Sequence, residues 1–191
     1  MPSVFLISDT HLGHANMLTF KNWDGSPVRA FSSVEEMDET IVDNWNRVVK
    51  PGDKVYHLGD AVMNKKSLPI FSRLNGKKVL IKGNHDTCTL KQYAEHFYDI
   101  RGSHLLDNFI LSHIPVHPAA LEARWCNGNI HGHLHNNLVM MDQVADSGIG
   151  EFIDQVPDPR YFNMSVERIN YTPVAFEDLV LSARNRKNIT S

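Results

Sequence analysis

The chain has 191 residues, of which 42% are apolar, enough to form the hydrophobic core of one compact domain. The formal net charge of −3 and the pI near 6.4 argue against a protein that binds nucleic acid mainly through a large basic surface. The N-terminal apolar run is too short for a signal peptide or a membrane span, and the two cysteines lack the spacing of a zinc site or a disulfide framework. We therefore expect a single cytoplasmic domain over residues 1–191.

Short runs rich in β-branched residues alternate with helical patterns, which predicts strand-helix-strand units and a largely parallel sheet of the α/β class. The expected strands are Val4 to Ser8, Val55 to Leu58, Lys78 to Lys82, Phe109 to Ser112, Asn129 to His131 and Phe162 to Arg168. Because parallel strands end at the same edge of a sheet, residues that follow them are expected to gather there.

Helical signals occur between these strands. The clearest begins at Ser33, which has capping-box spacing to Glu36, and ends before Pro51-Gly52. Its apolar residues recur at helical intervals and predict a face packed in the core: Val34, Met37, Ile41, Trp45 and Val48. Three more helices are expected, from Ser67 to Asn75-Gly76, from Leu90 to Phe97 and from Glu177 to Ala183. The stretch from Val139 to Pro159 lacks periodicity and is expected to be loop and irregular strand.

Five short blocks rich in Asp, Asn and His each follow a predicted strand. They are Asp9-Thr10-His11, Gly59-Asp60, Gly83-Asn84-His85-Asp86, Ser112-His113 and Gly132-His133-Leu134-His135. This layout places seven metal-ligand groups and one proton donor at one edge of a sheet, which is how a two-metal hydrolytic site is assembled. The histidine-rich ligand set favours metals of the Mn, Fe, Co and Zn series over Mg²⁺ and Ca²⁺.

The spacing within the blocks indicates how each residue is used. In Asp9-x-His11 and His133-x-His135, a two-residue interval in extended backbone points both side chains to one side. Asp60 has two oxygens and is suited to bridge two cations about 3.5–4 Å apart. Asn84 offers a neutral carbonyl oxygen, and the adjacent His85 points elsewhere, which leaves its ring free to donate a proton.

A purely structural explanation competes with this interpretation. Any single histidine at a strand end is more often a hydrogen-bonded polar residue than a ligand. The joint occurrence of five histidines in the five blocks reverses that preference. His57 and His131 lie inside predicted strands beside the blocks, and either could support a ligand through a hydrogen bond or merely fill space.

In this order the blocks resemble the calcineurin-like metallophosphoesterase superfamily, whose pattern is D-x-H, G-D, G-N-H-[DE], a later H and G-H-x-H. The resemblance extends from Asp9 to His135 and is closest to small prokaryotic and phage-type members. It implies an α/β fold of two packed mixed sheets flanked by helices, an αββα sandwich. The second block continues as Ala61-Val62-Met63-Asn64 and lacks the Asp and Arg of protein serine/threonine phosphatases, so that activity is disfavoured.

The superfamily pattern also implies a role for each residue of the site. Asp9, His11 and His135 would hold one metal, Asn84, His113 and His133 the other, and Asp60 would bridge them. His85 would be the catalytic acid, and Asp86 its orienting partner. Two divalent ions are expected as cofactors, Mn²⁺ first, with Fe, Zn, Co or Ni as alternatives.

The segment that follows the first block is expected to overhang the metals. We expect His14, Asn16 and Arg29 in it to contact substrate phosphate or base, because Arg can bind phosphate through two hydrogen bonds. Solvated loop residues are the alternative explanation.

The function expected from these patterns is phosphodiester hydrolysis in a small, nucleotide-like molecule, with water as the nucleophile and His85 as the general acid. A phosphomonoesterase, a short-oligonucleotide nuclease and a non-catalytic interaction module stabilised by metals remain alternatives. The expected partner is a small phosphoester, with no membrane and no protein partner indicated. The oligomeric state stays open.

Overall fold

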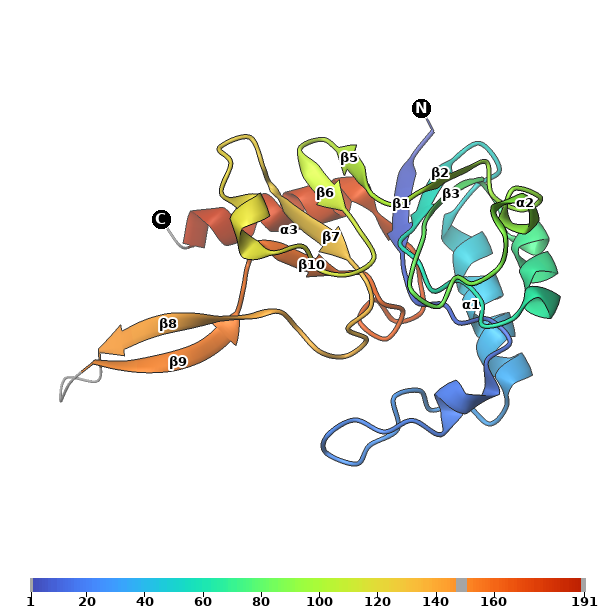
Figure 1. Ribbon diagram of the computed structural model, residues 1–191, viewed down its shortest axis with the longest axis horizontal. Helices are drawn as coiled ribbons and strands as arrows, with labels where there is room; N and C mark the ends of the chain where they lie inside the picture. The colour runs from blue at the N-terminus through green and yellow to red at the C-terminus, as the bar shows by residue number, and fades with distance from the viewer. Residues whose placement is uncertain (1, 147–150, 190–191) are drawn as a thin grey trace.

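The computed structural model describes residues 2–146 and 151–189, which form two main sheets and a separate hairpin (Figure 1). The first sheet has five strands in the order β11-β1-β2-β3-β4. Its strands are β1 (Val4–Ile7), β2 (Lys54–His57), β3 (Lys77–Ile81), β4 (Asp99–Arg101) and β11 (Val174–Ala175). The second sheet has four strands in the order β10-β7-β6-β5. They are β5 (His104–Leu106), β6 (Phe109–Leu111), β7 (Gly128–His131) and β10 (Tyr161–Asn163).

Parallel pairing dominates both sheets. Strands β1 to β4 are parallel to one another, and β11 is antiparallel to β1. Strands β6, β7 and β10 are also parallel, and β5 is antiparallel to β6. The predicted α/β class with a parallel core is thus confirmed. The last expected strand, Phe162 to Arg168, ends early, because β10 stops at Asn163.

The hydrophobic core covers both faces of the first sheet. In β1, Phe5 and Ile7 point to one side and Leu6 to the other, as the two-residue period of a strand requires. Leu6 belongs to the cluster that joins the first sheet to Phe109 and other residues of the second sheet. Phe5 and Ile7 belong to the cluster beneath α1 (Val34–Val48). A helix, a sheet and a second sheet therefore follow one another as layers.

Helix α1 is fixed by its cap and by its apolar face. Ser33 accepts a hydrogen bond from the Glu36 N–H at 3.1 Å, whereas the Glu36 carboxylate accepts from the Ser32 N–H at 2.7 Å. The reciprocal half of the predicted capping box is therefore displaced by one residue. The predicted core face is confirmed by three fully buried side chains, Met37, Ile41 and Trp45. Each contributes about 1.5–3 kcal/mol by burial.

The helix predicted from Ser67 to Asn75-Gly76 is instead a 3-10 helix over Lys65–Arg73. Asn64 caps it by accepting from the Lys66 N–H at 3.0 Å. Pro69 lies inside this segment, and because proline has no N–H and its ring crowds the preceding turn, a regular α-helix is disfavoured there.

Two other helices differ from expectation in length. The segment predicted as helix from Leu90 to Phe97 is α-helical over Leu90–Tyr93 (α2) and continues as turns. The last helix, α3, covers Phe176–Ile189 and is longer than predicted. Among the described residues, no helix combines the length and the apolar character that crossing a membrane requires.

The stretch from Val139 to Pro159, expected to be loop and irregular strand, contains two regular strands, and its residues 147–150 lie outside the described part of the chain. Strands β8 (Met140–Asp146) and β9 (Glu151–Pro157) pair antiparallel as a hairpin that projects from the body of the molecule (Figure 1). Asp142 and Val144 are two residues apart and lie on the same face of β8, and both are exposed. The hairpin therefore lacks the one-sided apolar pattern of a half-buried strand. Strands β4, β5 and β11 were also not predicted, because they have only two or three residues.

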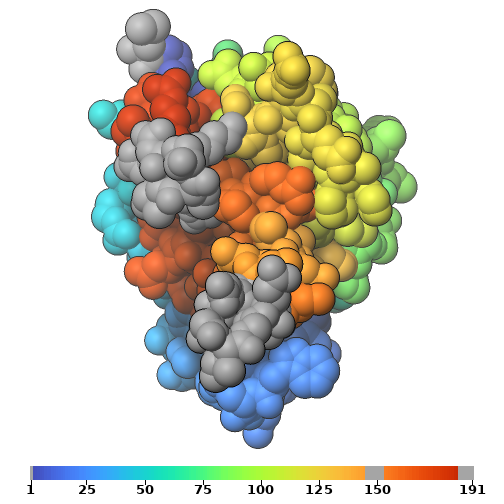
Figure 2. Space-filling view, turned by 90° about the vertical axis from the view of Figure 1, so that its left-hand side faces the viewer, coloured from blue at the N-terminus to red at the C-terminus, as the bar shows by residue number. Residues whose placement is uncertain are grey.

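Residues 13–31 form an insertion between β1 and α1 that projects below the first sheet in Figure 1. It begins with a 3-10 helix, Ala15–Leu18, and continues into a hydrogen-bonded turn. In that turn the Asn22 N–H donates to the Ser26 carbonyl at 2.8 Å, and the Gly25 N–H donates to the Asn22 carbonyl at 2.9 Å. Figure 2 shows the insertion (blue) below the hairpin strands (orange). A further 3-10 helix covers Pro118–Leu121.

Candidate metal centre

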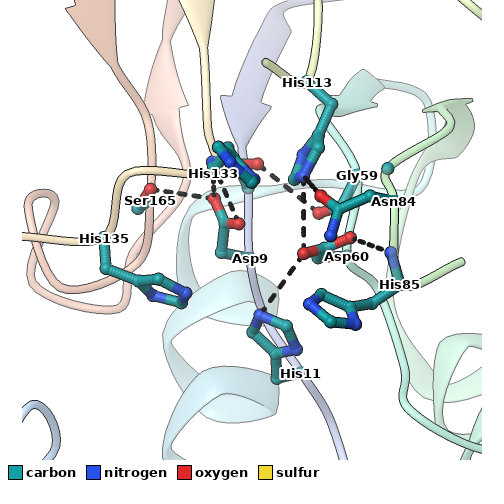
Figure 3. A network of polar contacts seen from close by, with 12 residues as sticks. Asp9, His11, Gly59, Asp60, Asn84, His85, His113, His133, His135 and Ser165 are labelled. Carbon is teal, nitrogen blue, oxygen red and sulfur yellow. Dashed lines mark hydrogen bonds and ion pairs between the residues drawn. The ribbon is translucent and has the colours of Figure 1, made fainter. Parts of the chain in front are cut away.

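The turns that follow β1, β2, β3, β6 and β7 bring all seven predicted metal ligands to one place (Figure 3). Two groups of three residues can each place their ligand atoms within 4.8 Å of one another. The first group is Asp9, His11 and His135, and the second is Asp60, His113 and His133. Asn84 joins the second group, since its Oδ1 lies 2.8 Å from Nε2 of His113.

Five of these residues have left-handed backbone conformations, with φ between 46° and 71°. They are Asp9, His11, Asp60, His133 and His135. A non-glycine residue in this region costs roughly 1–2 kcal/mol, and such strain concentrates at functional sites. Hydrogen bonds between turns hold the conformation, because the Asp9 N–H donates to the Gly59 carbonyl and the His11 N–H to the Asp60 carbonyl, both at 3.0 Å.

Hydrogen-bond acceptors converge around His113. Its Nδ1 lies 2.8 Å from the Leu58 carbonyl oxygen, which can only accept, so the proton of the neutral ring is on Nδ1. In the neutral ring Nε2 then carries a lone pair and faces Oδ1 of Asn84 at 2.8 Å and Oδ2 of Asp60 at 3.4 Å. Burial lowers the pKa of His113, but the nearby carboxylates of Asp60 and Asp9 outweigh burial and raise it, so Nε2 binds a proton more readily when no cation is present. Three acceptor atoms facing one another are the arrangement that a cation satisfies.

The imidazole ring of His11 forms no hydrogen bond within the part of the chain that the structure describes. Both ring nitrogens are buried and unpartnered among the described residues, a situation that costs about 1–3 kcal/mol per group. Burial, with a smaller effect of the Arg29 charge, lowers the pKa of His11 to about 2, so the ring is neutral near pH 7. A neutral imidazole is the form that binds a metal.

Asp9 is fully buried and held from two directions. Its carboxylate accepts from the His133 N–H at 2.9 Å and from the Ser165 hydroxyl at 2.8 Å. Burial raises the pKa of Asp9, and a neighbouring cation would favour the ionised form again. A Cβ at Gly132 would overlap Oγ of Ser8 and Oδ2 of Asp9, which explains the glycine before His133.

Asp60, a member of the second group, lies between His113 and His11 of the first group in Figure 3. Its Oδ2 is 3.4 Å from His113 Nε2 and 3.7 Å from His11 Nε2, and its Oδ1 accepts the His85 N–H at 2.8 Å. Burial alone would raise the pKa of Asp60, but the His113 ring and the His85 N–H outweigh burial and lower the pKa to about 2. An ionised carboxylate that approaches His113 of one group and His11 of the other is placed where a bridging ligand would be needed, and the bridging role stays a prediction.

Glu167, which no sequence pattern predicted as part of the site, supports the first group. Its carboxylate accepts from His135 Nδ1 at 3.0 Å and from Arg29 Nε at 2.7 Å, and its side chain is only 2% exposed. The bond to Nδ1 directs the lone pair of His135 Nε2 toward the other ligands, the usual arrangement behind a metal-binding histidine. Burial would raise the pKa of Glu167, but His135 and Arg29 lower it to about 2. Ser165 was missed too, and neither residue lies in a recognisable motif.

The prediction that Arg29 contacts substrate is wrong. Arg29 is buried, and its guanidinium donates to Glu167 and to the carbonyls of Asp9 and Thr10. It therefore fixes the backbone of the first ligand block from inside the protein. His14 is half-buried, with its ring centroid 5.8 Å from that of His11.

Asn16 is exposed in the 3-10 helix Ala15–Leu18. For both His14 and Asn16, contact with substrate stays a prediction.

Asp86 does not orient His85 as expected. Its buried carboxylate accepts from the backbone N–H groups of Asp60 and Ala61, both at 2.9 Å, and of Gly83 at 2.7 Å. The Tyr93 hydroxyl donates to the same carboxylate at 3.2 Å. These four donors occupy both oxygens, so Asp86 joins the turn after β2 to the turn after β3 instead.

The His85 side chain is exposed beside the ligands, and its ring centroid lies 5.9 Å from that of His11. His57, whose role the sequence left open, is buried with Nε2 2.9 Å from Oγ1 of Thr10, the residue between Asp9 and His11. It therefore supports the first block. His131 contacts the carbonyl of the next residue through Nδ1 at 2.8 Å and packs on Tyr161.

The donor set fits two divalent cations of the Mn to Zn series. It combines imidazole nitrogens, carboxylates and an amide oxygen, and it includes an unpartnered buried histidine and facing acceptors. Asp9, His11 and His135 would hold one ion, Asn84, His113 and His133 the other, and Asp60 would contact both.

Comparison with known proteins finds similarity along nearly the whole chain. The uncharacterized protein MJ1445 of Methanocaldococcus jannaschii is 37% identical over 184 residues, covering 94% of this chain and 90% of that protein. The Gene 66 protein of Mycobacterium phage L5 is 33% identical over 91 residues, 45% of this chain and 41% of that protein. The crystal structure of the protein of unknown function AQ665 from Aquifex aeolicus matches with a TM-score of 0.66 and 26% identity, covering 94% of this chain and 98% of that one. No protein-family profile matches the chain.

Proposed function

The chain belongs to the family of the uncharacterized protein MJ1445 of Methanocaldococcus jannaschii, and we propose that it is a metal-dependent phosphodiesterase of the calcineurin-like metallophosphoesterase superfamily. Its substrate would be a small, nucleotide-like phosphodiester. Manganese is the first candidate for both ions, with Fe, Zn, Co or Ni as alternatives.

The main support is the convergence of acceptors on Asp60. His113 Nε2 and Asn84 Oδ1 approach from one side, and the unpartnered His11 ring approaches from the other. Without a cation, both ring nitrogens of His11 are buried without a hydrogen-bond partner among the described residues, at a cost of roughly 1–3 kcal/mol per group. The strained backbone of five ligand residues adds to that cost.

The layered architecture supports the superfamily assignment. Two mixed sheets pack face to face, and the ligand blocks follow strands of both sheets in the order D-x-H, G-D, G-N-H-D, H and G-H-x-H. Membership of the superfamily would imply an αββα sandwich for this chain.

Each residue of the site has a separate role in the proposed hydrolysis. A bound pair of divalent ions supplies charge neutralisation of the phosphate and activation of water. His85, exposed beside the ligands, donates a proton to the leaving oxygen, a role that contributes about 10²–10⁴-fold in rate. Glu167 and His57 hold His135 and Thr10 in position, and Asp86 keeps the turn of Asp60 in place.

Hydrolysis of bis-p-nitrophenyl phosphate with added Mn²⁺ tests the proposal. We expect turnover by the native protein, and a His85→Ala protein that binds the same amount of metal but is at least about 100-fold slower. His117→Ala, at an exposed loop position, is the matched control and should keep native turnover. Absence of hydrolysis by a protein that holds two metals per chain would refute the enzymatic function and favour an interaction module. Faster hydrolysis of p-nitrophenyl phosphate would make it a phosphomonoesterase.

A further inference from the structure

A groove of about 960 Å³ opens directly beside the candidate metal centre, between the insertion and the segment that follows β7. His135 lines its inner end, and Phe20, Lys21, Trp23 and Arg168 line the rest. A hydrogen bond of 3.0 Å from the Asn136 amide to the Asn22 side chain ties its two walls together. The volume is at the upper end of the roughly 300–1,000 Å³ of ligand pockets.

Two aromatic side chains in this groove are exposed to an unusual degree. Phe20 is 47% exposed and Trp23 is 99% exposed. Trp23 lies in the turn closed by the Gly25 N–H to Asn22 carbonyl bond, so that hydrogen-bonded backbone presents its ring to solvent. Flat aromatic faces presented in this way are the platforms on which nucleobases stack.

A series of rings connects the metal centre to the groove. The centroid distances are 5.4 Å from His135 to His11, 5.8 Å from His11 to His14 and 6.1 Å from His14 to Phe20. A molecule with its scissile phosphate at the metals would therefore meet Phe20 first and Trp23 further out.

The groove also carries positive charge. Lys21 and Arg168 are both exposed, and neither forms an ion pair with another residue in the described part of the chain. The one acidic residue of the groove, Asp24, accepts hydrogen bonds from Ser26. Cations beside exposed aromatic rings are suited to bind a phosphate next to a base.

We propose that this groove is the nucleobase subsite of the enzyme. The base of a nucleotide phosphodiester stacks on Trp23 and Phe20, and Lys21 and Arg168 bind a phosphate beside it. The inference rests on the proposed phosphodiesterase function and assigns its substrate class. A short nucleotide and the end of a single strand share this chemistry.

Two substrates with the same leaving group test the subsite by activity. Thymidine 5′-(p-nitrophenyl phosphate) carries a base, and methyl p-nitrophenyl phosphate carries none. In Trp23→Ala the ratio of kcat/KM for the thymidine ester to that for the methyl ester should fall at least about fivefold, from loss of one stacking contact. Trp125→Ala, which removes a tryptophan that is 50% exposed and does not line the groove, should keep the native ratio. An unchanged ratio in Trp23→Ala overturns the subsite.

Fluorescence provides a readout that does not need turnover. In Trp125→Phe, Trp23 is the exposed tryptophan, since Trp45 is fully buried. Thymidine 5′-monophosphate should quench its emission, and ribose 5-phosphate should not. Lys21→Ala and Arg168→Ala should weaken the quenching titration. Equal quenching by both compounds, or none by either, refutes base stacking.

The two measurements separate failure of the subsite from failure of the proposed function. If no variant hydrolyses either ester, phosphodiesterase activity is refuted and the fluorescence titration alone decides the groove. If both esters are hydrolysed in a native ratio by Trp23→Ala, only the subsite is refuted. Tighter binding of an oligothymidylate of eight nucleotides than of thymidine 5′-monophosphate would identify a single strand as the ligand. Equal affinity for the two compounds would identify a small nucleotide.

Discussion

Glu167 offers the sharpest test of how the metal centre is supported. Its carboxylate receives hydrogen bonds from His135 and Arg29, and the Arg29 side chain is completely buried. In Glu167→Gln the amide oxygen can still accept both hydrogen bonds, because both donors contact Oε1. The substitution removes the charge and places an amide N–H donor where Oε2 is buried without a partner among the described residues.

The expected loss has two parts. Removing one charge of a buried ion pair leaves the other uncompensated and typically costs 3–5 kcal/mol, and since Gln retains the hydrogen bonds we expect about 3 kcal/mol here. Loss of the carboxylate behind a metal-binding histidine lowers metal affinity by about 10–100-fold. The stability change does not require metal and can be measured in its absence.

Urea unfolding of the metal-free protein and calorimetric titration with Mn²⁺ measure the two parts separately. Glu35→Gln, at an exposed position of α1, is the control and should change neither quantity. A Glu167→Gln protein with native metal affinity, or with a free energy of unfolding within about 0.5 kcal/mol of native, would refute the reasoning.

Three further substitutions give distinct outcomes. Gly132→Ala forces a methyl group against the carboxylate of Asp9, so Mn²⁺ affinity measured by calorimetry should fall, and native affinity would contradict the steric argument. Burial raises the pKa of Asp38 to about 6, so the folded state binds the Asp38 proton more tightly than the unfolded state does. The stability that this proton contributes is complete below about pH 4 and is lost as the pH rises through about 6. The melting temperature of Asp38→Asn minus that of the native protein should therefore be larger at pH 8 than at pH 5. The same difference at both pH values would refute the pKa shift. Asp86→Asn replaces an acceptor that backbone N–H groups need, so urea unfolding should show a loss of about 2 kcal/mol or more. Native stability with reduced kcat would instead restore a role in orienting His85.

Local patterns predicted the strands β1, β2, β3, β6, β7 and β10 and the ligand blocks that follow five of them. Runs rich in β-branched residues predict the parallel strands β1 to β3, and each ligand block directly follows its strand in sequence. Chain order and strand polarity then suffice to bring Asp9, Asp60 and His113 together. The metals themselves and the catalytic role of His85 stay predictions.

The residues that sequence missed or misassigned act through contacts between distant segments. Arg29 was taken for a surface residue because its partner, Glu167, follows it by more than a hundred residues. Asp86 stands next to His85 in sequence, yet its carboxylate turns inward to the backbone of Asp60. The regular pairing of β8 with β9 was not predicted, because the side chains of residues 140–144 and 153–157 are exposed or half-buried on both faces, which removes the alternation that marks a half-buried strand.

The distribution of the candidate ligands over both sheets has a mechanical consequence. Asp60 follows a strand of the first sheet, whereas His113 and His133 follow strands of the second. An ion held by all three would act as a reversible cross-link between the layers, and because the unfolded chain has no preformed site, its binding free energy would stabilise the folded state. Loading with metal would then lock the spacing of the two sheets, and a chelator would release it.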